Sequence, residues 1–276
     1  MRKVFAKKSF GQNFLRDEGV IARIVSEISP KEGENLIEIG PGLGALTEPV
    51  ADLTDHITVI ELDRELAEKL RHHPFIREKL DVVEEDALRA DFRRFRTDER
   101  KLRIYGNLPY NISTQLLFHL MEFESDISDM TFMLQREVVD RLTGAVSTAD
   151  YGRLSVMVQY HFHAEKLFDV SPDSFIPAPK VWSSIVRLTP LKEKPSVAKD
   201  EKFMGIMVRD AFNLRRKTIR NSLGAFVSGG ELEELGYDPR LRAENLTVDD
   251  FVRISNFAYD KKADAANPEG RKWLYI

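Results

Sequence analysis

The sequence predicts an α/β protein with a doubly wound, mostly parallel Rossmann-like sheet and a small all-α domain at its C-terminal end. Two observations support this prediction. Short β-branched runs alternate with amphipathic helical runs as far as residue 135, an alternation typical of parallel βαβ units. From Lys202 onward only helical periodicity remains, after a polar, proline-containing stretch typical of a linker. The expected divisions are therefore residues 1–190, a linker at 191–201, and residues 202–276.

The individual elements follow from hydrophobic spacing and turn residues. A helix over 17–29 places its apolar residues on one face and ends before Pro30. Strands are expected over 35–39, 56–62, 80–84, 102–105, 130–134 and 181–189. Further helices are expected over 45–53, 64–73, 113–122, 202–226, 231–236 and 247–259. Asn111 or Ser113 would cap the helix at 113–122, a capping box would open the last helix at Thr247, and 153–160 fits either a helix or a strand.

Composition excludes several kinds of protein. Of the 276 residues, 42% are hydrophobic, enough for one large domain and a smaller appendage. The absence of cysteine excludes disulfides, thiolate zinc sites and a cysteine nucleophile, and it fits a reducing cytoplasm. The basic start lacks the apolar core of a signal peptide and no apolar run approaches bilayer length, so we expect a cytoplasmic protein. The histidines do not have metal-ligand spacing, and no metal is expected.

The formal net charge of −4 means that any nucleic-acid surface must be a local basic patch. Residues 1–16 contain no acid, and residues 209–220 contain only Asp210. The candidate RNA-binding side chains in these two segments are Lys7, Lys8, Arg215, Arg216, Lys217 and Arg220. Arg216 and Arg220 would share a helix face at i, i+4 spacing, which suits phosphate binding. A solvated charged face is the alternative interpretation.

The tetrapeptide Asn107-Leu-Pro-Tyr110 suits the presentation of a flat exocyclic amine. The Asn107 side-chain oxygen and the carbonyl of Leu108 or Pro109 can each accept one N–H of an amino group. The Tyr110 ring can stack on the heterocycle that carries the amine. Pro109 fixes its own φ and biases Leu108 toward an extended conformation, so the acceptors are held in place. An ordinary turn is the alternative for four residues of this kind.

Four residues of interest each follow a predicted strand, namely Gly40, Glu61, Asp86 and Asn107. The intervals between them are 21, 25 and 21 residues. Because the carboxyl ends of the strands of an open α/β sheet line one crevice, these positions should converge on one ligand. The spacing therefore favours a binding site over a turn for the tetrapeptide.

The loop Glu38–Ala45 resembles the dinucleotide-binding fingerprint, in which glycines such as Gly40 and Gly42 let the backbone approach a ligand closely. The Glu38 carboxylate, however, is a poor neighbour for the pyrophosphate of NAD. It is a reasonable neighbour for a cofactor that carries an ammonium or a sulfonium group.

The two later carboxylates fit the rest of such a cofactor. Glu61 can accept hydrogen bonds from two ribose hydroxyls, and Asp86, followed by Ala87, can accept one from an adenine amino group. The alternative for both acids is that they cap helices. Together with the tetrapeptide, these residues predict S-adenosylmethionine-dependent N-methylation.

The chain resembles the bacterial small-subunit (16S) rRNA adenine N6,N6-dimethyltransferases, the family whose loss confers kasugamycin resistance. The matching segments occur in family order along nearly the whole chain: KKSFGQNFL (7–15), EIGPGLGALTEPV (38–50), TVIELDR (58–64), GNLPYNIS (106–113), YGRLSVMVQY (151–160), FIPAPKVWS (175–183), AFNLRRKTIRNSL (211–223) and AENLTV (243–248). The resemblance implies a class I methyltransferase domain followed by a helical RNA-binding domain.

The resemblance also implies roles for individual residues. Asn13 and Leu15 would belong to an N-terminal segment that closes over the cofactor, and Gly40 would lie beneath its methionine portion. Asn107 would lie where cofactor and target meet. Glu61 would hold the ribose of the cofactor, and Asp86 its adenine. Trp182 occupies a variable position of the FIPAPKVWS motif.

The implied target is a pair of adjacent adenines near the 3′ end of 16S rRNA in an immature small subunit, methylated by a monomeric enzyme. Each base would be extruded into the site, with Tyr110 on one face and Phe175 as a candidate for the other. A loop anchor beside two prolines is the alternative for Phe175. No dedicated general base is required, because a methylated ammonium loses its proton readily.

Other functions remain open at this point. A large-subunit rRNA adenine methyltransferase uses the same chemistry, although the FGQNFL and RRKTIRNSL segments favour the small-subunit enzyme. A DNA adenine methyltransferase shares the tetrapeptide, but the helical tail argues against it. A non-catalytic ribosome-assembly factor of this fold is disfavoured by Glu61, Asp86 and the intact tetrapeptide, and an NAD oxidoreductase by Glu38.

Overall fold

The computed structural model describes residues 13–213 and 216–266 and divides the chain into two compact units. The first unit comprises the chain up to Asp140 together with His161–Pro190. The second comprises Arg141–Tyr160 and the chain from Leu191 onward. The expected first domain, residues 1–190, contains residues 141–160, whereas the second compact unit includes them.

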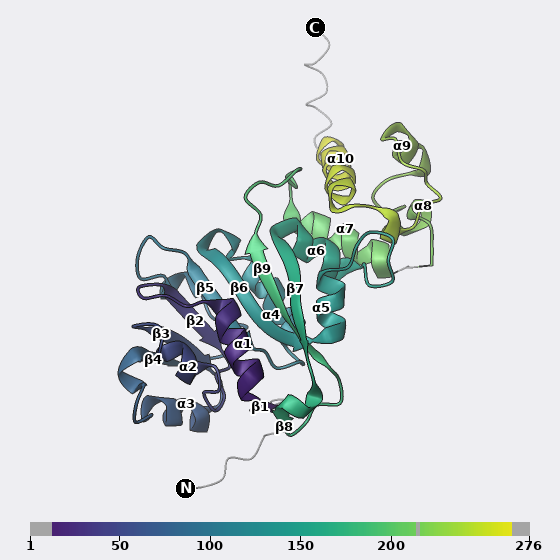
Figure 1. Cartoon of the computed structure of the whole chain (residues 1–276). Helices are drawn as coiled ribbons and strands as arrows, with labels where there is room; N and C mark the ends of the chain where they lie inside the picture. Colours follow the sequence, from purple (N-terminus) through teal and green to yellow (C-terminus); the bar gives the residue numbers. More distant parts are fainter. Residues whose placement is uncertain (1–12, 214–215, 267–276) are drawn as a thin grey trace. The chain divides into compact units, whose positions relative to one another are not determined.

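A seven-stranded sheet forms the centre of the first unit (Figure 1). Its strands, in spatial order, are β4 (Leu80–Glu84), β3 (Ile57–Glu61), β2 (Asn35–Ile39), β5 (Leu102–Asn107), β6 (Ile127–Gln135), β9 (Ser183–Pro190) and β7 (Phe162–Val170). The first five are parallel, and β9 runs antiparallel to both of its neighbours. The predicted doubly wound, mostly parallel sheet is confirmed.

The helices of this unit are α1 (Glu18–Ile28), α2 (Thr47–Ala51), α3 (Arg64–Arg71), α4 (Ser113–Met121) and the start of α5 (Arg136–Leu142). Two of them begin at side-chain caps, because Asp17 accepts a hydrogen bond from the Val20 N–H and Asp63 from the Glu65 N–H. The cap expected for α4 is wrong. No side chain caps that helix, and the Ser113 hydroxyl donates to the Tyr110 carbonyl instead.

A second, two-stranded sheet joins distant parts of the chain. β1 (Phe14–Leu15) pairs antiparallel with β8 (Phe175–Ile176), with Leu15 opposite Phe175. The Arg16 N–H extends this pairing by donating to the Ser174 carbonyl. The N-terminal segment is thereby fixed beside the segment that leads into β9, as Figure 1 shows near its lower edge.

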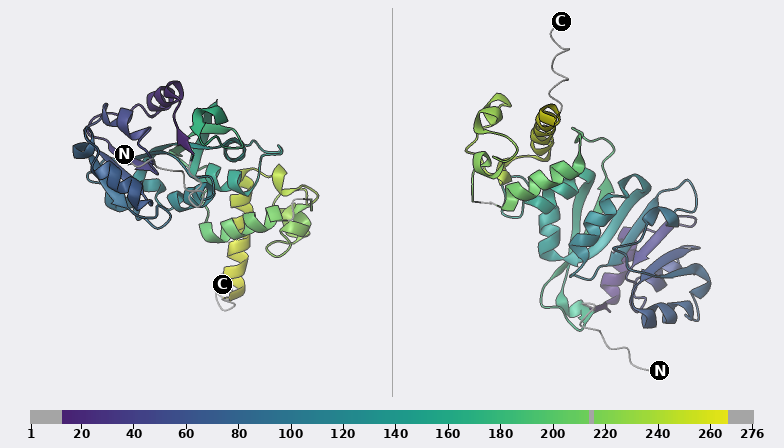
Figure 2. Two further views of the ribbon diagram at one scale, coloured as in Figure 1. Left: turned by 90° about the horizontal axis from the view of Figure 1, so that it is seen from below. Right: turned by 180° about the vertical axis from the view of Figure 1, so that it is seen from behind.

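The second unit is helical, with α6 (Arg153–His161), α7 (Glu201–Asn213), α8 (Ile219–Ser222), α9 (Gly229–Glu234) and α10 (Val248–Ala266) (Figure 2). The ambiguous segment 153–160 is thus a helix. The capping box at the start of α10 is confirmed by reciprocal hydrogen bonds between Thr247 and Asp250. The single helix expected over 202–226 is wrong, because α7 ends at Asn213 and a separate short helix follows.

Replacement of Gly106 by alanine should destabilise the first unit. A Cβ atom at this position would lie 2.4 Å from the carbonyl oxygen of Ile39 in the neighbouring strand, and backbone on both sides leaves little room to relax. We expect the free energy of unfolding to fall by about 3 kcal/mol, measured by urea titration. Gly19→Ala on the exposed first turn of α1 is the matched control and should change stability by no more than about 1 kcal/mol. Equal stability of the two variants would contradict the account.

Candidate functional site

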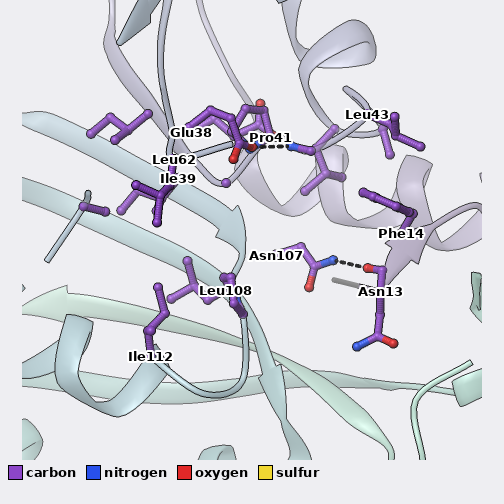
Figure 3. A pocket seen from close by; sticks show the side chains of 18 of the residues that line it. Asn13, Phe14, Glu38, Ile39, Pro41, Leu43, Leu62, Asn107, Leu108 and Ile112 are labelled. Carbon is purple, nitrogen blue, oxygen red and sulfur yellow. Dashed lines mark hydrogen bonds between the residues drawn. The ribbon is translucent and has the colours of Figure 1, made fainter. Parts of the chain in front are cut away.

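A cavity of about 330 Å³ lies where β2, β3 and β5 end, as expected for an open α/β sheet. Figure 3 shows side chains from these strand ends and from the N-terminal segment surrounding it. The cavity brings together all of the residues that the sequence predicts for cofactor binding: Asn13, Leu15, Glu38, Gly40, Gly42, Glu61, Asp86, Ala87 and Asn107.

The cavity wall is acidic. Its ionisable side chains, apart from Tyr110, are the carboxyl groups of Glu38, Glu61, Glu85 and Asp86, and no described residue lining it is basic. A pyrophosphate would be repelled by such a wall, whereas a ligand with ammonium and sulfonium charges would be attracted. These carboxylates therefore fit S-adenosylmethionine and do not fit NAD.

The glycine loop after β2 gives the cofactor access to the backbone. Gly40 and Gly42 have φ values of 67° and 60°, a region that other residues adopt only with strain. The Gly40 N–H donates to the Ile60 carbonyl at 2.9 Å, which holds the loop against β3. The Phe14 ring lies over Gly42, where a Cβ atom would be 3.4 Å from it.

Glu61 is the last residue of β3, and its side chain is buried at the edge of the cavity. One carboxylate oxygen accepts from the Gly42 N–H at 3.1 Å and the other from the Asp63 N–H at 2.8 Å. Burial raises the pKa of this carboxyl despite these hydrogen bonds. Because Asp63, not Glu61, caps α3, the helix-cap interpretation is excluded, and the remaining lone pairs can accept from hydroxyl groups.

Asp86 lies two residues beyond β4, and its side chain is about one-third exposed. Its Oδ1 accepts from the Leu88 N–H at 3.0 Å, so the side chain stabilises a turn and does not cap a helix. Ala87 is buried beside it and also lines the cavity. The carboxylate is thereby held at the cavity edge, where it can accept from an amino group.

Glu38 is almost fully buried beneath the glycine loop. Its carboxylate accepts a hydrogen bond from the Tyr105 hydroxyl at 3.1 Å. Loss of hydration on burial raises its pKa to about 7, with a smaller contribution from the negative charge of Glu61. A cation bound in the cavity would reverse this effect by favouring the ionised form.

The tetrapeptide begins at the last residue of β5 (Figure 3). The Asn107 amide nitrogen donates to the Asn13 carbonyl at 3.2 Å, which leaves the amide oxygen as the acceptor. The Pro109 carbonyl already accepts from the Ile112 N–H, so the Leu108 carbonyl is the better second acceptor. The Leu108 N–H donates to the Met133 carbonyl, and this bond ties the tetrapeptide to β6.

Tyr110 is held by the start of β9. Its hydroxyl lies 2.7 Å from the Ser183 Oγ, and burial raises its pKa, so the phenol remains neutral. The ring lines the cavity beside Asn107. A ring fixed at both its backbone and its hydroxyl is suited to stacking on a base.

The stacking role expected for Phe175 is not supported. Its side chain is 3% exposed and belongs to the hydrophobic core with residues of α1 and β9, including Val25 and Ile185. It does not line the cavity. Phe175 is therefore the loop anchor that the sequence allowed as the alternative, because its pairing with Leu15 turns the side chain into the core.

Sequence reasoning missed several apolar residues that line the cavity. Phe14 lies over the glycine loop, Leu62 directly follows Glu61 and is half exposed, and Ile112 closes the tetrapeptide turn. Leu43, in the middle of the glycine loop, is also exposed. Phe14, Leu43 and Leu62 are each adjacent in sequence to a predicted site residue, and Ile112 lies two residues after Tyr110, so closeness in sequence was the available signal.

The predicted RNA-binding residues fall into two groups. Lys7, Lys8 and Arg215 lie outside the described residues. Arg216, Lys217 and Arg220 are exposed, but the helix face expected for them is wrong, because Arg216 precedes α8 in a turn.

The structure adds two arginines to the exposed group of Arg216, Lys217 and Arg220. Thr218 pairs antiparallel with Arg242, and the Ile219 N–H donates to the Leu241 carbonyl. The pairing places the exposed Arg240 and Arg242 beside residues 216–220. Residues 216–220 and 238–242 together carry five basic side chains and one acid, Asp238, which pairs with Arg240. Glu244 lies just beyond.

Within the described part of the chain, no group of three His, Asp or Glu side chains is arranged to hold a metal ion. A search of the same residues finds no helix long and apolar enough to cross a membrane.

The fold and the acidic cavity at its strand ends define a class I, S-adenosylmethionine-dependent methyltransferase. The family model described as "Ribosomal RNA adenine dimethylase" matches residues 4–260. The chain belongs to this family, and it is therefore an rRNA adenine dimethyltransferase with S-adenosyl-L-methionine as its cofactor.

The chain is also similar to individual members of this family. The chain is 53% identical over 255 residues to a "Ribosomal RNA small subunit methyltransferase A" of Vibrio atlanticus, covering 92% of this chain and 94% of the relative. It is 50% identical over 270 residues to the protein of the same name from Haemophilus influenzae, covering 96% and 94%.

Two solved structures are also similar. A dimethyladenosine transferase from Plasmodium falciparum has a TM-score of 0.75 at 24% identity, covering 91% of this chain and 98% of that one, and supports the fold. The 23S rRNA methyltransferase ErmE has a TM-score of 0.68 at 28% identity, covering 90% and 100%.

Cofactor affinity should depend on pH through Glu38. Below about pH 7 its carboxyl is protonated in the free protein, and a bound cation favours the ionised form, so binding releases a proton. Affinity should therefore rise by up to about tenfold per pH unit as the pH increases from about 5 to 7, and level off above. Calorimetry in buffers of different ionisation enthalpy measures both the affinity and the proton release.

Two variants test the assignment of this pH dependence. Glu38→Gln should abolish it, and Tyr105→Phe should move it to higher pH, because one of the hydrogen bonds that lower the Glu38 pKa is lost. Unaltered proton release in Glu38→Gln would rule out Glu38 as the group responsible.

Proposed function

We propose that this enzyme transfers methyl groups from S-adenosylmethionine to the exocyclic amines of two adjacent adenines near the 3′ end of small-subunit rRNA. Its substrate would be an immature small ribosomal subunit in the cytoplasm, and it would act as a monomer without a metal ion. The observation that carries the chemistry is the position of Asn107 in the wall of the acidic cavity, with its amide oxygen available as an acceptor.

The adenine amine is a weak nucleophile because its lone pair is delocalised into the ring. Hydrogen bonds from its two N–H groups to the Asn107 amide oxygen and the Leu108 carbonyl favour a more pyramidal nitrogen. They also stabilise the positive charge that develops on the nitrogen during transfer. The cofactor supplies the electrophilic methyl group when it is bound, so the residues of this chain contribute alignment and exclusion of water.

The site couples the target acceptor to the cofactor cavity. The Asn107 amide is oriented by the Asn13 carbonyl, whose neighbours Phe14 and Leu15 line the cavity. Tyr110, three residues after Asn107, supplies a stacking surface, and its hydroxyl is held by Ser183. A shift of the N-terminal segment on cofactor binding would therefore move the Asn13 carbonyl. Because this carbonyl orients the Asn107 amide, the acceptor for the target amine would move as well.

The choice of small-subunit RNA is supported by relatives at 50–53% identity that cover more than nine-tenths of both chains. The large-subunit alternative is represented by ErmE at 28% identity. A non-catalytic role is disfavoured because Glu38, Glu61, Asp86 and Asn107 all line one cavity.

The basic surface of the second unit is the proposed RNA contact. The ion pairs of the described residues do not involve Arg216, Lys217 or Arg220, so these cations are available to phosphates. These three residues form a cluster with Arg240, Arg242, Asp238 and Glu244. The net charge of this cluster is positive, whereas that of the whole chain is negative.

The proposed activity is tested with labelled S-adenosylmethionine and small subunits from cells that lack the modification. We expect label in small-subunit RNA, mapped to adjacent adenines by primer-extension stops. Label in large-subunit RNA or in DNA under the same conditions would contradict the proposal.

Replacing Asn107 by alanine should lower kcat about 10²- to 10³-fold, because one of the two acceptors for the reacting amine is lost. Cofactor affinity should fall much less than kcat, since Glu61 and Asp86 remain as the proposed ribose and adenine ligands. Single-turnover transfer and calorimetric cofactor binding measure the two effects. Methylation at the wild-type rate would remove the proposed role of this side chain.

Replacing Arg216 and Arg220 together by alanine should weaken binding of the small subunit and flatten its salt dependence. Loss of two phosphate contacts lowers the slope of log K against log salt by about 1.4–1.8. Cofactor affinity should be unchanged. The matched control is Lys69→Ala with Arg77→Ala, two exposed cations of the first unit, which should leave the slope intact. Equal slopes for both double variants would contradict the proposed surface.

A further inference from the structure

Trp182 is an exposed aromatic residue whose role the reaction described above does not explain. Among the Phe and Trp side chains that the structure describes, only those of Trp182 and Phe75 are classed as exposed, at 48% and 87%. Exposing an indole to water carries a free-energy cost that a surface position normally avoids. An exposed indole of this kind is therefore a candidate for a functional contact.

Trp182 lies at the catalytic edge of the sheet. β9 begins at the next residue, Ser183, which pairs with Gln135 at the carboxyl end of β6. The Ser183 Oγ is the atom that holds the Tyr110 hydroxyl at 2.7 Å. One peptide unit thus separates the exposed indole from the residue that fixes the stacking ring of the active site.

The backbone around Trp182 is held in place. Its carbonyl accepts from the Arg136 N–H at 2.9 Å, at the start of α5. The segment before it runs from β8, which is paired with β1, through Pro177 and Pro179, whose φ angles are restricted. An aromatic side chain on such a support loses little further backbone freedom when it binds a ligand.

The surroundings of Trp182 resemble a contact for a nucleobase more than a hydrophobic interface. Val181 and Ile176 are also exposed, at 43% and 51%, and Lys180 adds a positive charge to the same segment. Arg136, half exposed beside it, lies 3.7–3.8 Å from Asp140 and Asp169. Lys180, together with exposed apolar and aromatic side chains, suits bases and the phosphates that join them.

We propose that Trp182 stacks on a nucleotide of the RNA that flanks the target adenine and so positions the target strand at the site. This inference rests on the proposed function, because it assumes an RNA substrate, and it assigns one contact that the methyl-transfer residues do not supply. Trp182 is a positioning residue: it touches neither the reacting nitrogen nor the cofactor. Stacking on an extruded neighbour also offsets part of the cost of taking the target base out of its helix.

The first test is spectroscopic and uses the full chain. The sequence has two tryptophans, Trp182 and Trp273, so Trp273→Phe leaves Trp182 as the only indole fluorophore. Titration with a single-stranded RNA of about ten nucleotides containing two adjacent adenines should quench this fluorescence to saturation. Quenching should persist as salt is raised at saturating RNA, because stacking is not ionic. Unquenched fluorescence in the bound complex would overturn the proposal.

The second test is kinetic. Trp182→Ala should raise KM for small subunits and weaken oligonucleotide binding by about five- to a hundredfold, with little change in kcat. Trp182→Phe should retain most of the affinity, since it keeps an aromatic face. Phe75→Ala is the matched control, an exposed aromatic before β4 at the amino end of the parallel strands, and should have no effect. Unchanged cofactor affinity in each variant verifies that the protein is folded.

The outcomes separate this inference from the function on which it rests. If the wild-type enzyme methylates small subunits and Trp182→Ala does so with the same KM, the inference alone is wrong. If Trp182→Ala weakens binding to the particle but not to the oligonucleotide, Trp182 contacts a part of the particle other than the target strand, and the inference is also wrong. Failure of the wild-type enzyme to methylate small-subunit RNA would overturn the proposed function itself.

Discussion

The parallel pairing of β2 with β3 on one side and β5 on the other is the constraint on which the site depends. Ile39 is opposite Ile60 and Glu38 is opposite Tyr105, so all three strands end at one level. Gly40, Glu61 and Asn107 follow or end these strands and therefore meet around one cavity. Gly106 permits this arrangement, because any side chain there would meet the Ile39 carbonyl. A one-residue change of register in β3 or β5 would turn Glu61 or Asn107 to the other face of the sheet.

Charge selects the ligand of that cavity. Rossmann-like loops commonly receive phosphates, since glycines and free N–H groups favour anions. Here the Gly42 N–H is already used by the Glu61 carboxylate, and Glu38 lies buried directly beneath the loop. The same backbone geometry therefore presents negative charge in place of free donors. The hydrogen bond from Asn107 to Asn13 then connects the N-terminal wall of the acidic cavity to the side chain proposed as the acceptor for the target amine.

Local patterns predicted the first unit well and the second unit less well. The strands over 35–39 and 80–84 have the predicted bounds, because each is a short β-branched run bordered by turn residues. The helix expected over 202–226 is broken, because Thr218 pairs with Arg242 and the chain between the two helical runs must leave helical geometry. Similarly, residues 141–160 join the second unit through contacts such as the Tyr151 hydroxyl with the Leu246 carbonyl, which are 95 residues apart.

The sequence by itself determined the fold class, the four strand-end positions and the acidic character of the site, because strand periodicity and residue type are local properties. Tertiary structure alone decided which aromatic rings are available. Phe175 is buried by its pairing with Leu15, whereas Trp182, seven residues later, remains exposed. It also decided that burial raises the pKa of Glu38 to about 7 and that Arg240 and Arg242 join the basic surface. Burial, pKa and charge clustering depend on segments far apart in the chain, and a local pattern carries no information about them.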